Sequence, residues 1–311
     1  MRIVYMGTPD IAVPCLRFLA ESKHEVVGVL TQPDRPKGRG HHTIPTPVKA
    51  AALEYGIPVY QPLSLRKGED AAAALETLRQ LAPDLIVVLA YGQILPKEVL
   101  ELPKYHCINL HASLLPAYRG AAPIQWVILN GETKTGVTAQ QMAEGLDTGD
   151  MLVKKEIAIG AEETAEELYE RLSELCVETL TEETLEQLEA GTLQGTPQDD
   201  AQSSYASRIT KEMSALDFTR PAAELHNLIR GITGFTMLEG KRLKVYGSRV
   251  VEGVSGEAGT IAEPEDFIVA CGDGNGLRFT EIQPEGKRRM AAADFLRGKK
   301  LKKGEKLGNA E

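Results

Sequence analysis

The stretch Asp84–Ala90 (DLIVVLA) constrains the fold of this chain more than any other, because it is almost continuously apolar. A strand without polar alternation is typical of a parallel sheet that is covered on both faces. Two earlier β-runs, Met1–Tyr5 and Val26–Thr31, are separated by a helical segment that ends at Ser22. The order strand, helix, strand predicts an α/β domain with a Rossmann-like, doubly wound parallel sheet.

Short motifs and composition exclude several classes of function. Only one glycine follows the first strand, so the Gly-x-Gly-x-x-Gly fingerprint of dinucleotide-binding folds is missing and we expect no NAD. The four cysteines are far apart and make no Cys-x-x-Cys pair, which favours free thiols in a reducing compartment and argues against a zinc site. No apolar run approaches the length of a membrane span, and the first residues lead into a strand rather than a signal peptide. We therefore expect a cytoplasmic protein without a metal.

Polar side chains gather where a short apolar strand, Cys107–His111, ends. Side chains in a strand alternate between faces, so Asn109 and His111 point the same way. The carboxyl ends of strands in open α/β sheets are where ligand crevices form. Downstream, Asp147 lies in the turn Gly145–Asp150 between two glycines. An amide, an imidazole and a carboxylate are therefore candidates for one pocket, although each alone is also compatible with an ordinary structural role.

The whole string around these residues resembles the 10-formyltetrahydrofolate-dependent formyltransferases. The matching positions are Asn109, His111, Ser113-Leu114-Leu115-Pro116, Arg119-Gly120 and the Gly-Leu-Asp-Thr-Gly-Asp turn that holds Asp147. The resemblance implies that Asn109, His111 and Asp147 are catalytic. It also implies a folate slot lined by Ser113, Leu114, Leu115 and Pro116 and by the loop Tyr91, Gly92, Gln93, Ile94 and Leu95.

The chemistry of formyl transfer suits these three side chains. An amine must be neutral to attack, and an imidazole such as that of His111 can take up its proton near neutral pH. The Asn109 amide can donate to the formyl oxygen as it becomes an oxyanion, a contribution of roughly 3–4 kcal/mol at comparable sites. Asp147 can orient the imidazole and stabilise its cation. We expect 10-formyltetrahydrofolate as the formyl donor.

A proline-rich basic segment, Gln32–Lys49, interrupts the first domain, and its composition predicts a long loop without regular structure. Such a loop is either a solvated connection or a functional element. In the branch of the family that formylates initiator methionyl-tRNA, a basic insertion at this position grips the acceptor arm. The resemblance therefore implies tRNA contacts by Arg35, Lys37, Arg39, His41, His42 and Lys49.

The second half of the chain predicts a smaller domain. The stretch 162–190 holds eleven Glu and one basic residue, Arg171, and is typical of a solvated helix with a leucine stripe. This stretch carries the chain's acidic excess, so the net charge of −9 does not exclude an RNA partner. Residues 191–204 are polar and indicate a linker. We thus expect a catalytic domain over 1–190 and a second domain over 205–311.

Short strands separated by Gly-containing turns follow the linker and suggest a small barrel. The resemblance implies an OB-like β-barrel that contacts tRNA. The segment Lys287–Lys306 has nine Lys or Arg and two acidic residues; it is either a solvated tail or an electrostatic guide for RNA.

Two alternatives stay open at this point. A sugar-nucleotide formyltransferase or a formyl-folate hydrolase would share Asn109, His111 and Asp147 without needing the basic loop. A non-catalytic RNA-binding protein on a disused Rossmann scaffold is the alternative from another class. Our preferred interpretation is a monomeric enzyme that transfers formyl from 10-formyltetrahydrofolate to initiator methionyl-tRNA.

Overall fold

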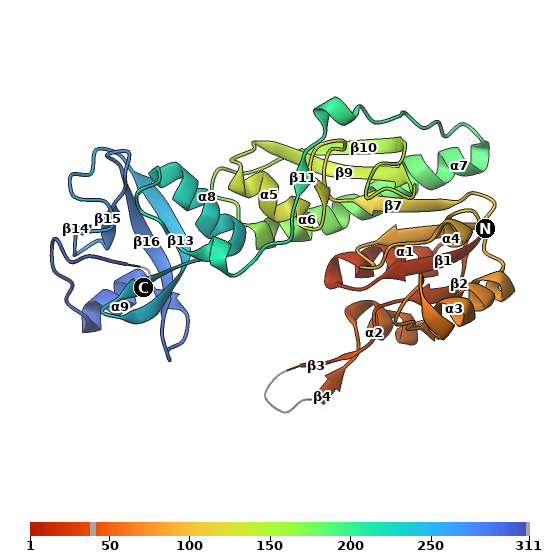
Figure 1. Ribbon diagram of the computed structural model, residues 1–311, viewed down its shortest axis with the longest axis horizontal. Helices are drawn as coiled ribbons and strands as arrows, with labels where there is room; N and C mark the ends of the chain where they lie inside the picture. The colour runs from red at the N-terminus through yellow and green to blue at the C-terminus, as the bar shows by residue number, and fades with distance from the viewer. Residues whose placement is uncertain (38–41, 309–311) are drawn as a thin grey trace. The chain divides into compact units, whose positions relative to one another are not determined.

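The computed structural model describes residues 1–37 and 42–308 (Figure 1). These residues form two compact units, which are described separately below. Unit 1 comprises residues 1–123, 134–158 and 168–206, and unit 2 comprises residues 124–133, 159–167 and those from 207 onward.

Unit 1 is built on a seven-stranded sheet in the order β10-β9-β7-β6-β1-β2-β5. Its strands are β1 (Arg2–Gly7), β2 (Glu25–Leu30), β5 (Val59–Tyr60), β6 (Leu85–Leu89), β7 (Cys107–His111), β9 (Lys134–Gln141) and β10 (Met151–Ala158). The five strands from β5 to β7 are parallel, whereas β9 and β10 are antiparallel additions beside β7. The predicted Rossmann-like parallel sheet is confirmed, and β6 is buried along its whole length, as its apolar sequence indicates.

Helices cover both faces of this sheet, as doubly wound folds require. The helices of unit 1 are α1 (Val13–Glu21), α2 (Pro47–Glu54), α3 (Gly68–Leu81), α4 (Lys97–Leu100), most of α6 (Ala165–Glu178), a π-helix (Thr179–Leu185), α7 (Glu186–Ala190) and the 3-10 helices Asp10–Ala12 and Asp200–Gln202. All of α5 (Pro123–Leu129) except its first residue belongs to unit 2. Leu78 of α3 and Val99 of α4 pack into one core cluster with Val4 and Ile86 of the sheet. On α6 the leucines predicted to form an apolar stripe are buried from Leu168 to Leu175, so this acidic helix turns its glutamates outward.

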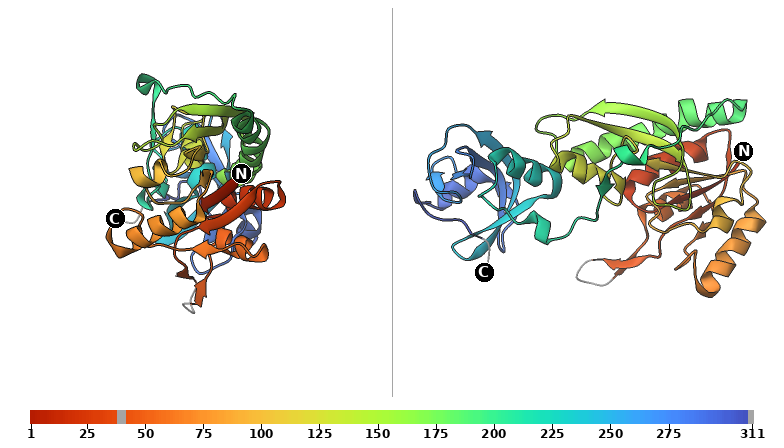
Figure 2. Two further views of the ribbon diagram at one scale, coloured as in Figure 1. Left: turned by 90° about the vertical axis from the view of Figure 1, so that its right-hand side faces the viewer. Right: turned by 45° about the horizontal axis from the view of Figure 1, so that its top comes forward.

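The predicted structureless loop over residues 32–49 is wrong for the described part of that segment. β3 (Arg35–Lys37) and β4 (His42–Ile44) pair antiparallel as a hairpin that projects beyond α2 (Figures 1 and 2). The end of the segment already belongs to α2, because the Thr46 side chain caps the helix by accepting from the amide of Lys49. Proline content hid this hairpin, since proline normally argues against a strand.

Unit 2 is an antiparallel sheet in the order β12-β13-β16-β15-β14, with β17 beside β16. Its elements are the 3-10 helix Glu212–Ser214, α8 (Ala222–Ile232), β12 (Gly234–Leu238), β13 (Lys241–Val251), β14 (Ile261–Glu263), β15 (Ile268–Ala270), β16 (Gly276–Pro284), β17 (Met290–Ala291) and α9 (Ala292–Gly298). Phe267, Phe279 and Leu225 are buried in one hydrophobic cluster that fills this unit.

The C-terminal segment 305–308 bridges the two edges of this sheet. Gly308 exchanges backbone hydrogen bonds with Met237 of β12, at 2.6 and 3.2 Å. The amide of Leu307 donates to the carbonyl of Gly259 at 2.7 Å, and the carbonyl of Glu305 accepts from the amide of Ile261 of β14. The sheet therefore closes through this segment, as a small barrel requires.

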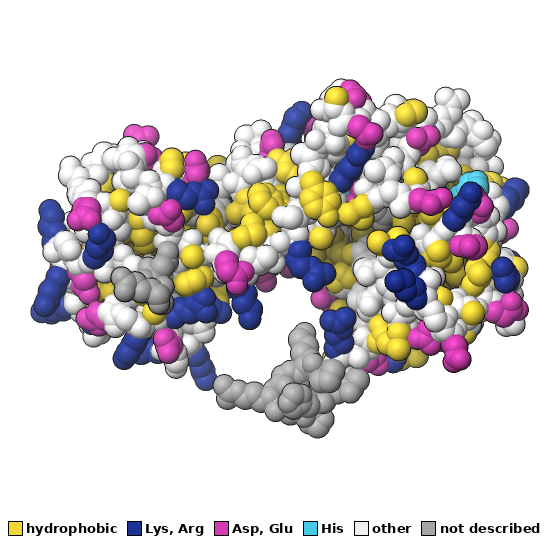
Figure 3. Space-filling model, in the orientation of Figure 1, with side chains coloured by type: hydrophobic (Ala, Val, Ile, Leu, Met, Phe, Trp, Pro, Cys, Tyr) yellow, Lys and Arg dark blue, Asp and Glu magenta, His cyan; other side chains and the backbone are white. Residues whose placement is uncertain are grey.

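Of the two alternatives for Lys287–Lys306, a solvated tail or an electrostatic guide for RNA, the structure contradicts the solvated tail. The segment contains β17 and α9, and Leu301, like Leu307 just beyond it, is buried in the core of unit 2. Its basic side chains, such as Lys300 and Lys303, are nevertheless exposed. Figure 3 shows Lys and Arg side chains over this unit, interspersed with acidic ones.

Candidate functional site

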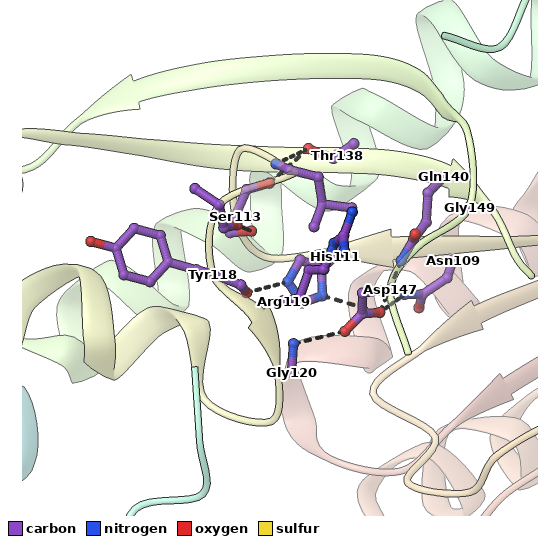
Figure 4. A network of polar contacts seen from close by, with 12 residues as sticks. Asn109, His111, Ser113, Tyr118, Arg119, Gly120, Thr138, Gln140, Asp147 and Gly149 are labelled. Carbon is purple, nitrogen blue, oxygen red and sulfur yellow. Dashed lines mark hydrogen bonds and ion pairs between the residues drawn. The ribbon is translucent and has the colours of Figure 1, made fainter. Parts of the chain in front are cut away.

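The three side chains predicted to be catalytic converge at the carboxyl end of β7 (Figure 4). Asp147 Oδ1 lies 3.5 Å from Asn109 Nδ2 and 3.6 Å from His111 Nδ1. The two-residue spacing places the amide and the imidazole on one face of the strand, as alternation requires. An amide donor, an imidazole and a carboxylate thus meet at one point of the structure.

The Asp147 carboxylate is held by further donors. Oδ1 accepts a hydrogen bond from Gln140 Nε2 at 2.9 Å, and Oδ2 accepts one from the backbone amide of Gly120 at 2.9 Å. Asp147 itself has a left-handed backbone with φ of 53°, which costs energy for a residue with a side chain. Position 149, two residues further on, must be a glycine, because a Cβ there would lie 1.7 Å from the carbonyl oxygen of Gln141.

The imidazole of His111 is buried, with 6% of the residue exposed, and its two nitrogens have different partners. Nε2 lies 2.8 Å from the carbonyl oxygen of Tyr118. A carbonyl oxygen only accepts, so Nε2 carries the hydrogen and donates it. In the neutral ring Nδ1 then holds the lone pair and faces Asp147, where it can accept a proton.

The segment Ser113–Pro116 is anchored to the antiparallel side of the sheet. Thr138 Oγ1 of β9 donates to the Ser113 carbonyl at 2.7 Å and accepts from the Leu115 amide at 3.1 Å. Lys154 of β10 donates to the Leu115 carbonyl at 2.9 Å. The side chains of Ser113 and Leu115 are fully buried, whereas Leu114 and Pro116 are half-buried.

A surface pocket adjoins the catalytic group. It is lined by Gln93, Ile94, Leu95, Gln140, Met142, Ala143, Glu144, Gly145, Leu146 and Asp147. Of the residues predicted to bind folate, the pocket thus contains Gln93, Ile94 and Leu95, but none of Ser113–Pro116. Ile94 is 54% exposed, while Tyr91 lies in the core with the pKa of its phenol raised by burial. Gly92 follows it with a φ of 86°.

Gln93 fixes the part of the pocket that the loop after β6 forms. Gln93 Nε2 donates to the Pro62 carbonyl and Gln93 Oε1 accepts from the Leu65 amide, each at 2.9 Å. Both hydrogen bonds use the side chain to hold backbone that precedes α3. The pocket wall is therefore preformed at Gln93 and apolar at Ile94 and Leu95, a combination common in small-molecule sites.

The predicted tRNA-binding residues lie in and beside the β3–β4 hairpin. Arg39 and His41 fall outside the described residues, and for Lys37 and His42 the structure describes the backbone, which pairs within the hairpin. Arg35 is exposed at the start of β3. Arg35, Lys37 and His42 thus belong to the hairpin strands, whereas Lys49 lies in α2.

Lys49 has partners inside the protein. Its ammonium lies 2.5 Å from Asp34 Oδ2 and 2.8 Å from Gln61 Oε1, and Gln61 Nε2 donates to Asp34 Oδ1 at 2.7 Å. Burial opposes ionisation of Asp34, but the hydrogen bonds from Lys49 and Gln61 outweigh it and lower the pKa of the carboxyl. This closed group of three side chains joins the base of the hairpin to α2 and β5.

Sequence reasoning missed two glutamines at the site. Gln140 lies opposite Asn109 in the antiparallel β7–β9 pair, so the register of that pair brings it to Asp147. Gln198 lies in the polar segment interpreted as a linker, yet its Nε2 donates to the carbonyl oxygens of Asp147 and Gly149, at 2.8 and 2.7 Å. The period-two pattern of β9 could have indicated the first, whereas no local pattern indicates the second.

Metal-binding clusters and membrane-spanning helices are both absent from the described residues. They contain no group of three or more His, Cys, Asp or Glu side chains arranged to hold a metal ion. Within residues 1–37 and 42–308, no helix is both long and apolar enough to cross a membrane.

Comparison with known proteins identifies the class. Residues 1–184 match the formyl transferase family, and residues 208–300 match the formyl transferase C-terminal domain. The chain therefore belongs to the formyl transferases. It is 50% identical over 317 residues to the methionyl-tRNA formyltransferase of Geobacter sulfurreducens, and this alignment covers 100% of this chain and 98% of the relative. The methionyl-tRNA formyltransferase of Alkaliphilus oremlandii is 49% identical over 99% of this chain and 100% of its own length. Within the formyl transferases, the chain belongs to the methionyl-tRNA formyltransferase family.

Solved structures share the fold at lower identity. A sugar 3N-formyl transferase, solved in the presence of dTDP and 5-N-formyl-THF, has a TM-score of 0.68 at 21% identity, covering 93% of this chain and 99% of its own. HypX from Aquifex aeolicus in complex with tetrahydrofolic acid has a TM-score of 0.62 at 18% identity, covering 95% of this chain and 47% of its own.

Proposed function

We propose that this protein transfers the formyl group of 10-formyltetrahydrofolate to the amino group of initiator methionyl-tRNA. The observation that carries the proposal is the convergence of Asn109, His111 and Asp147, with the imidazole Nδ1 directed at the carboxylate. Family membership supplies the substrates, and the site supplies groups for each step of the chemistry. The reaction makes N-formylmethionyl-tRNA for translation initiation, and we place the protein in the cytoplasm as a monomer.

In the first step His111 acts as the base. As the amine nitrogen bonds to the formyl carbon, Nδ1 of His111 accepts the proton that this nitrogen loses. The imidazolium that results has Nε2–H on the Tyr118 carbonyl at 2.8 Å and Nδ1–H facing Asp147 at 3.6 Å. Both sides of the charged ring therefore face acceptors, which stabilises the cation.

Asn109 stabilises the charge that forms on the formyl oxygen. Its amide has two N–H bonds, and Asp147 accepts one of them in a long contact of 3.5 Å. The second N–H can donate to the oxyanion. When the carbon–nitrogen bond to the donor breaks, the imidazolium returns its proton to the departing nitrogen, so the cycle ends with His111 neutral and tetrahydrofolate released.

We propose that the donor occupies the pocket beside Asp147. Gln93, Ile94 and Leu95 line it from the loop after β6, and Met142 to Leu146 line it from the segment after β9. Because Ser113 and Leu115 are buried and hydrogen-bonded to β9, we assign the segment Ser113–Pro116 a role in shaping the slot through its backbone rather than through side chains that line the pocket.

We propose that the acceptor tRNA uses the hairpin and the second domain. Arg35, Lys37, Arg39, His41 and His42 are the hairpin positions for its phosphates, with Lys49 as a structural support at the base. The functional division follows the chain: a catalytic domain over 1–190, a connecting segment over 191–204 and an OB-like tRNA-binding domain over 205–311. Exposed lysines such as Lys300 and Lys303 suit contact with a phosphate backbone.

A direct assay tests the function. Formyl transfer from labelled 10-formyltetrahydrofolate is measured with initiator methionyl-tRNA, uncharged tRNA and a UDP-amino sugar as parallel acceptors. We expect label on the methionyl-tRNA alone. Label on the amino sugar in place of the tRNA would reassign the acceptor, and release of free formate without an acceptor would make the protein a hydrolase.

A further inference from the structure

The segment Thr196–Ala206, here called the strap, crosses the catalytic loops of unit 1. Thr196 exchanges backbone hydrogen bonds with Met151 of β10, at 2.9 and 2.8 Å. At its other end, β11 (Tyr205–Ala206) pairs parallel with β8 (Arg119–Gly120). The strap is therefore bonded at one end to β10 of the seven-stranded sheet and at the other to β8, with which it forms a separate two-stranded sheet.

One strap residue holds the Asp147 turn. Gln198 Nε2 donates to the carbonyl oxygens of Asp147 and Gly149, at 2.8 and 2.7 Å. Gln198 Oε1 accepts from Arg119 Nε at 3.0 Å, which fixes the orientation of the amide. Both N–H groups of this amide are thus committed to the turn that carries the catalytic carboxylate.

A second strap residue, Ser204, bonds to the backbone of Tyr118, which lies on the Nε2 side of the His111 imidazole. Ser204 Oγ accepts from the amide of Tyr118 at 2.8 Å, and the Ser204 carbonyl accepts from the amide of Arg119 at 2.9 Å. The carbonyl of Tyr118 is the acceptor for His111 Nε2. The strap therefore hydrogen-bonds to the backbone of both residues that flank the His111 ring, Asp147 on the Nδ1 side and Tyr118 on the Nε2 side.

We propose that the strap is a positioning element for formyl transfer, with Gln198 and Ser204 as its positioning residues. The inference rests on the proposed function. Asp147 and Tyr118 both have left-handed backbones, with φ of 53° and 61°. Such conformations persist only where the surroundings impose them. Gln198 and Ser204 supply that constraint, and so set where the carboxylate and the carbonyl stand relative to the imidazole.

The test for Gln198 removes its two N–H donors without changing the size of the side chain. Gln198→Glu keeps the side-chain volume and the acceptor for Arg119 but loses both donors to the Asp147 turn. We expect kcat to fall by about 10- to 100-fold while the KM for each substrate stays within about twofold, because only the transition state depends on this alignment. The matched control is Gln202→Glu, since Gln202 lies in the same strap and donates to its own neighbour Asp199.

Ser204 supplies a milder variant that removes a single hydrogen bond. Ser204→Ala is expected to lower kcat by about 3- to 10-fold, with rescue in Ser204→Thr, which keeps the oxygen. Ser203→Ala is its control, because Ser203 Oγ donates to the Asp200 carbonyl within the strap rather than contacting the catalytic loops. Should Gln198→Glu prove insoluble, this pair keeps the inference testable.

The state of the His111 ring can also be measured without turnover, by NMR. In ¹⁵N-histidine NMR spectra the Nε2–H signal of His111 should be sharp in the wild type and in both controls, and broadened in Gln198→Glu and Ser204→Ala. Unchanged kcat and unchanged signals in those two variants would overturn the inference, as would a rise in both KM values with a loss of thermal stability. Absence of formyl transfer by the wild type would count against the proposed function alone.

Discussion

The Nε2 nitrogen of His111 lies 2.8 Å from the carbonyl oxygen of Tyr118, while Nδ1 faces Asp147 at 3.6 Å. This relationship selects the Nε2–H tautomer of the neutral ring, because a carbonyl oxygen cannot donate. The first prediction follows directly. The ¹⁵N spectrum of His111, assigned with a His111→Ala variant, should show Nε2 protonated and Nδ1 unprotonated at a pH where the ring is neutral. A ring protonated at Nδ1 would mean that Nδ1 is not the base.

The second prediction concerns the carboxylate. Asp147→Asn keeps the shape of the side chain but replaces one acceptor oxygen by an NH₂ group that faces donors from Gln140, Gly120 or Asn109. We expect kcat for formyl transfer to fall by on the order of 10²-fold or more with folding retained, and the same for Asn109→Ala and His111→Ala. Single-turnover formylation of charged tRNA measures it. A folded Asp147→Asn protein with wild-type turnover would contradict the assignment.

The third prediction concerns the hairpin. Lys37→Ala and Arg39→Ala should each raise the KM for methionyl-tRNA and leave the affinity for the folate donor unchanged. Each lost phosphate contact should also reduce the log–log salt dependence of tRNA binding by about 0.7–0.9. Lys104→Ala removes an exposed lysine elsewhere in unit 1 and serves as the control. Hairpin variants that match this control in both KM and salt slope would remove the hairpin from the tRNA site.

The fourth prediction concerns the Asp34–Lys49 pair. Lys49→Met leaves the Asp34 carboxylate partly buried beside Gln61 without its cation, and should lower the free energy of unfolding by roughly 1–3 kcal/mol at neutral pH. The folded pKa of Asp34 is depressed, so the unfolded carboxyl takes up its proton first as the pH falls. The pair's contribution is therefore complete above the unfolded value of about 3.9 and is lost as the pH drops further.

Urea unfolding at a series of pH values measures this contribution. The stability difference between wild type and Lys49→Met should be largest at neutral pH and shrink below about pH 4, where the carboxyl no longer needs a cation. A difference that stays constant down to pH 3 would show that the loss comes from packing of the lysine stem instead.

The fifth prediction concerns the closure of unit 2. Leu307 is 2% exposed, so Leu307→Ala should lower the stability of this unit by about 2–5 kcal/mol. The single tryptophan, Trp126, belongs to unit 2 and donates to the Ser207 carbonyl at 2.8 Å, so its fluorescence reports this unit. Lys306→Ala, an exposed neighbour, should change stability by less than about 0.5 kcal/mol. Equal effects of the two changes would mean that the segment does not close the barrel core.

The local features of the site were predictable from the sequence, and the long-range ones were not. Strand alternation places Asn109 and His111 together, and the glycine-bounded turn marks Asp147, because both depend on spacings of a few residues. Gln198 is 51 residues from Asp147 in the chain, and polar composition around it indicates only a connection. Its role exists only once the sheet has brought the two segments together.

The same limit explains the wrong prediction of a loop over residues 32–49 and why a solvated tail stayed open for Lys287–Lys306. The hairpin contains Pro36, and proline removes a donor that a strand normally needs, so the pattern favoured a loop. In Lys287–Lys306 the charge run concealed Leu301, whose burial depends on a core built from residues far away in the chain. The composition of such a segment gives only its mean polarity, whereas the burial of a single leucine can fix its place in the fold.

Because residues 305–308 bridge β12 and β14, the sheet of unit 2 can close only after this late part of the chain has been synthesised. A ribosome delivers Met237 and Ile261 well before Glu305 and Gly308. Until those last residues emerge, both sheet edges lack this partner and present open backbone donors and acceptors, the condition under which strands pair with the wrong chain. Unit 2 can therefore reach its closed form only after translation of this stretch has finished. A nascent chain stalled before Glu305 should bind chaperones and proteases more readily than the same chain after its release from the ribosome, when residues 305–308 are free to form the bridge.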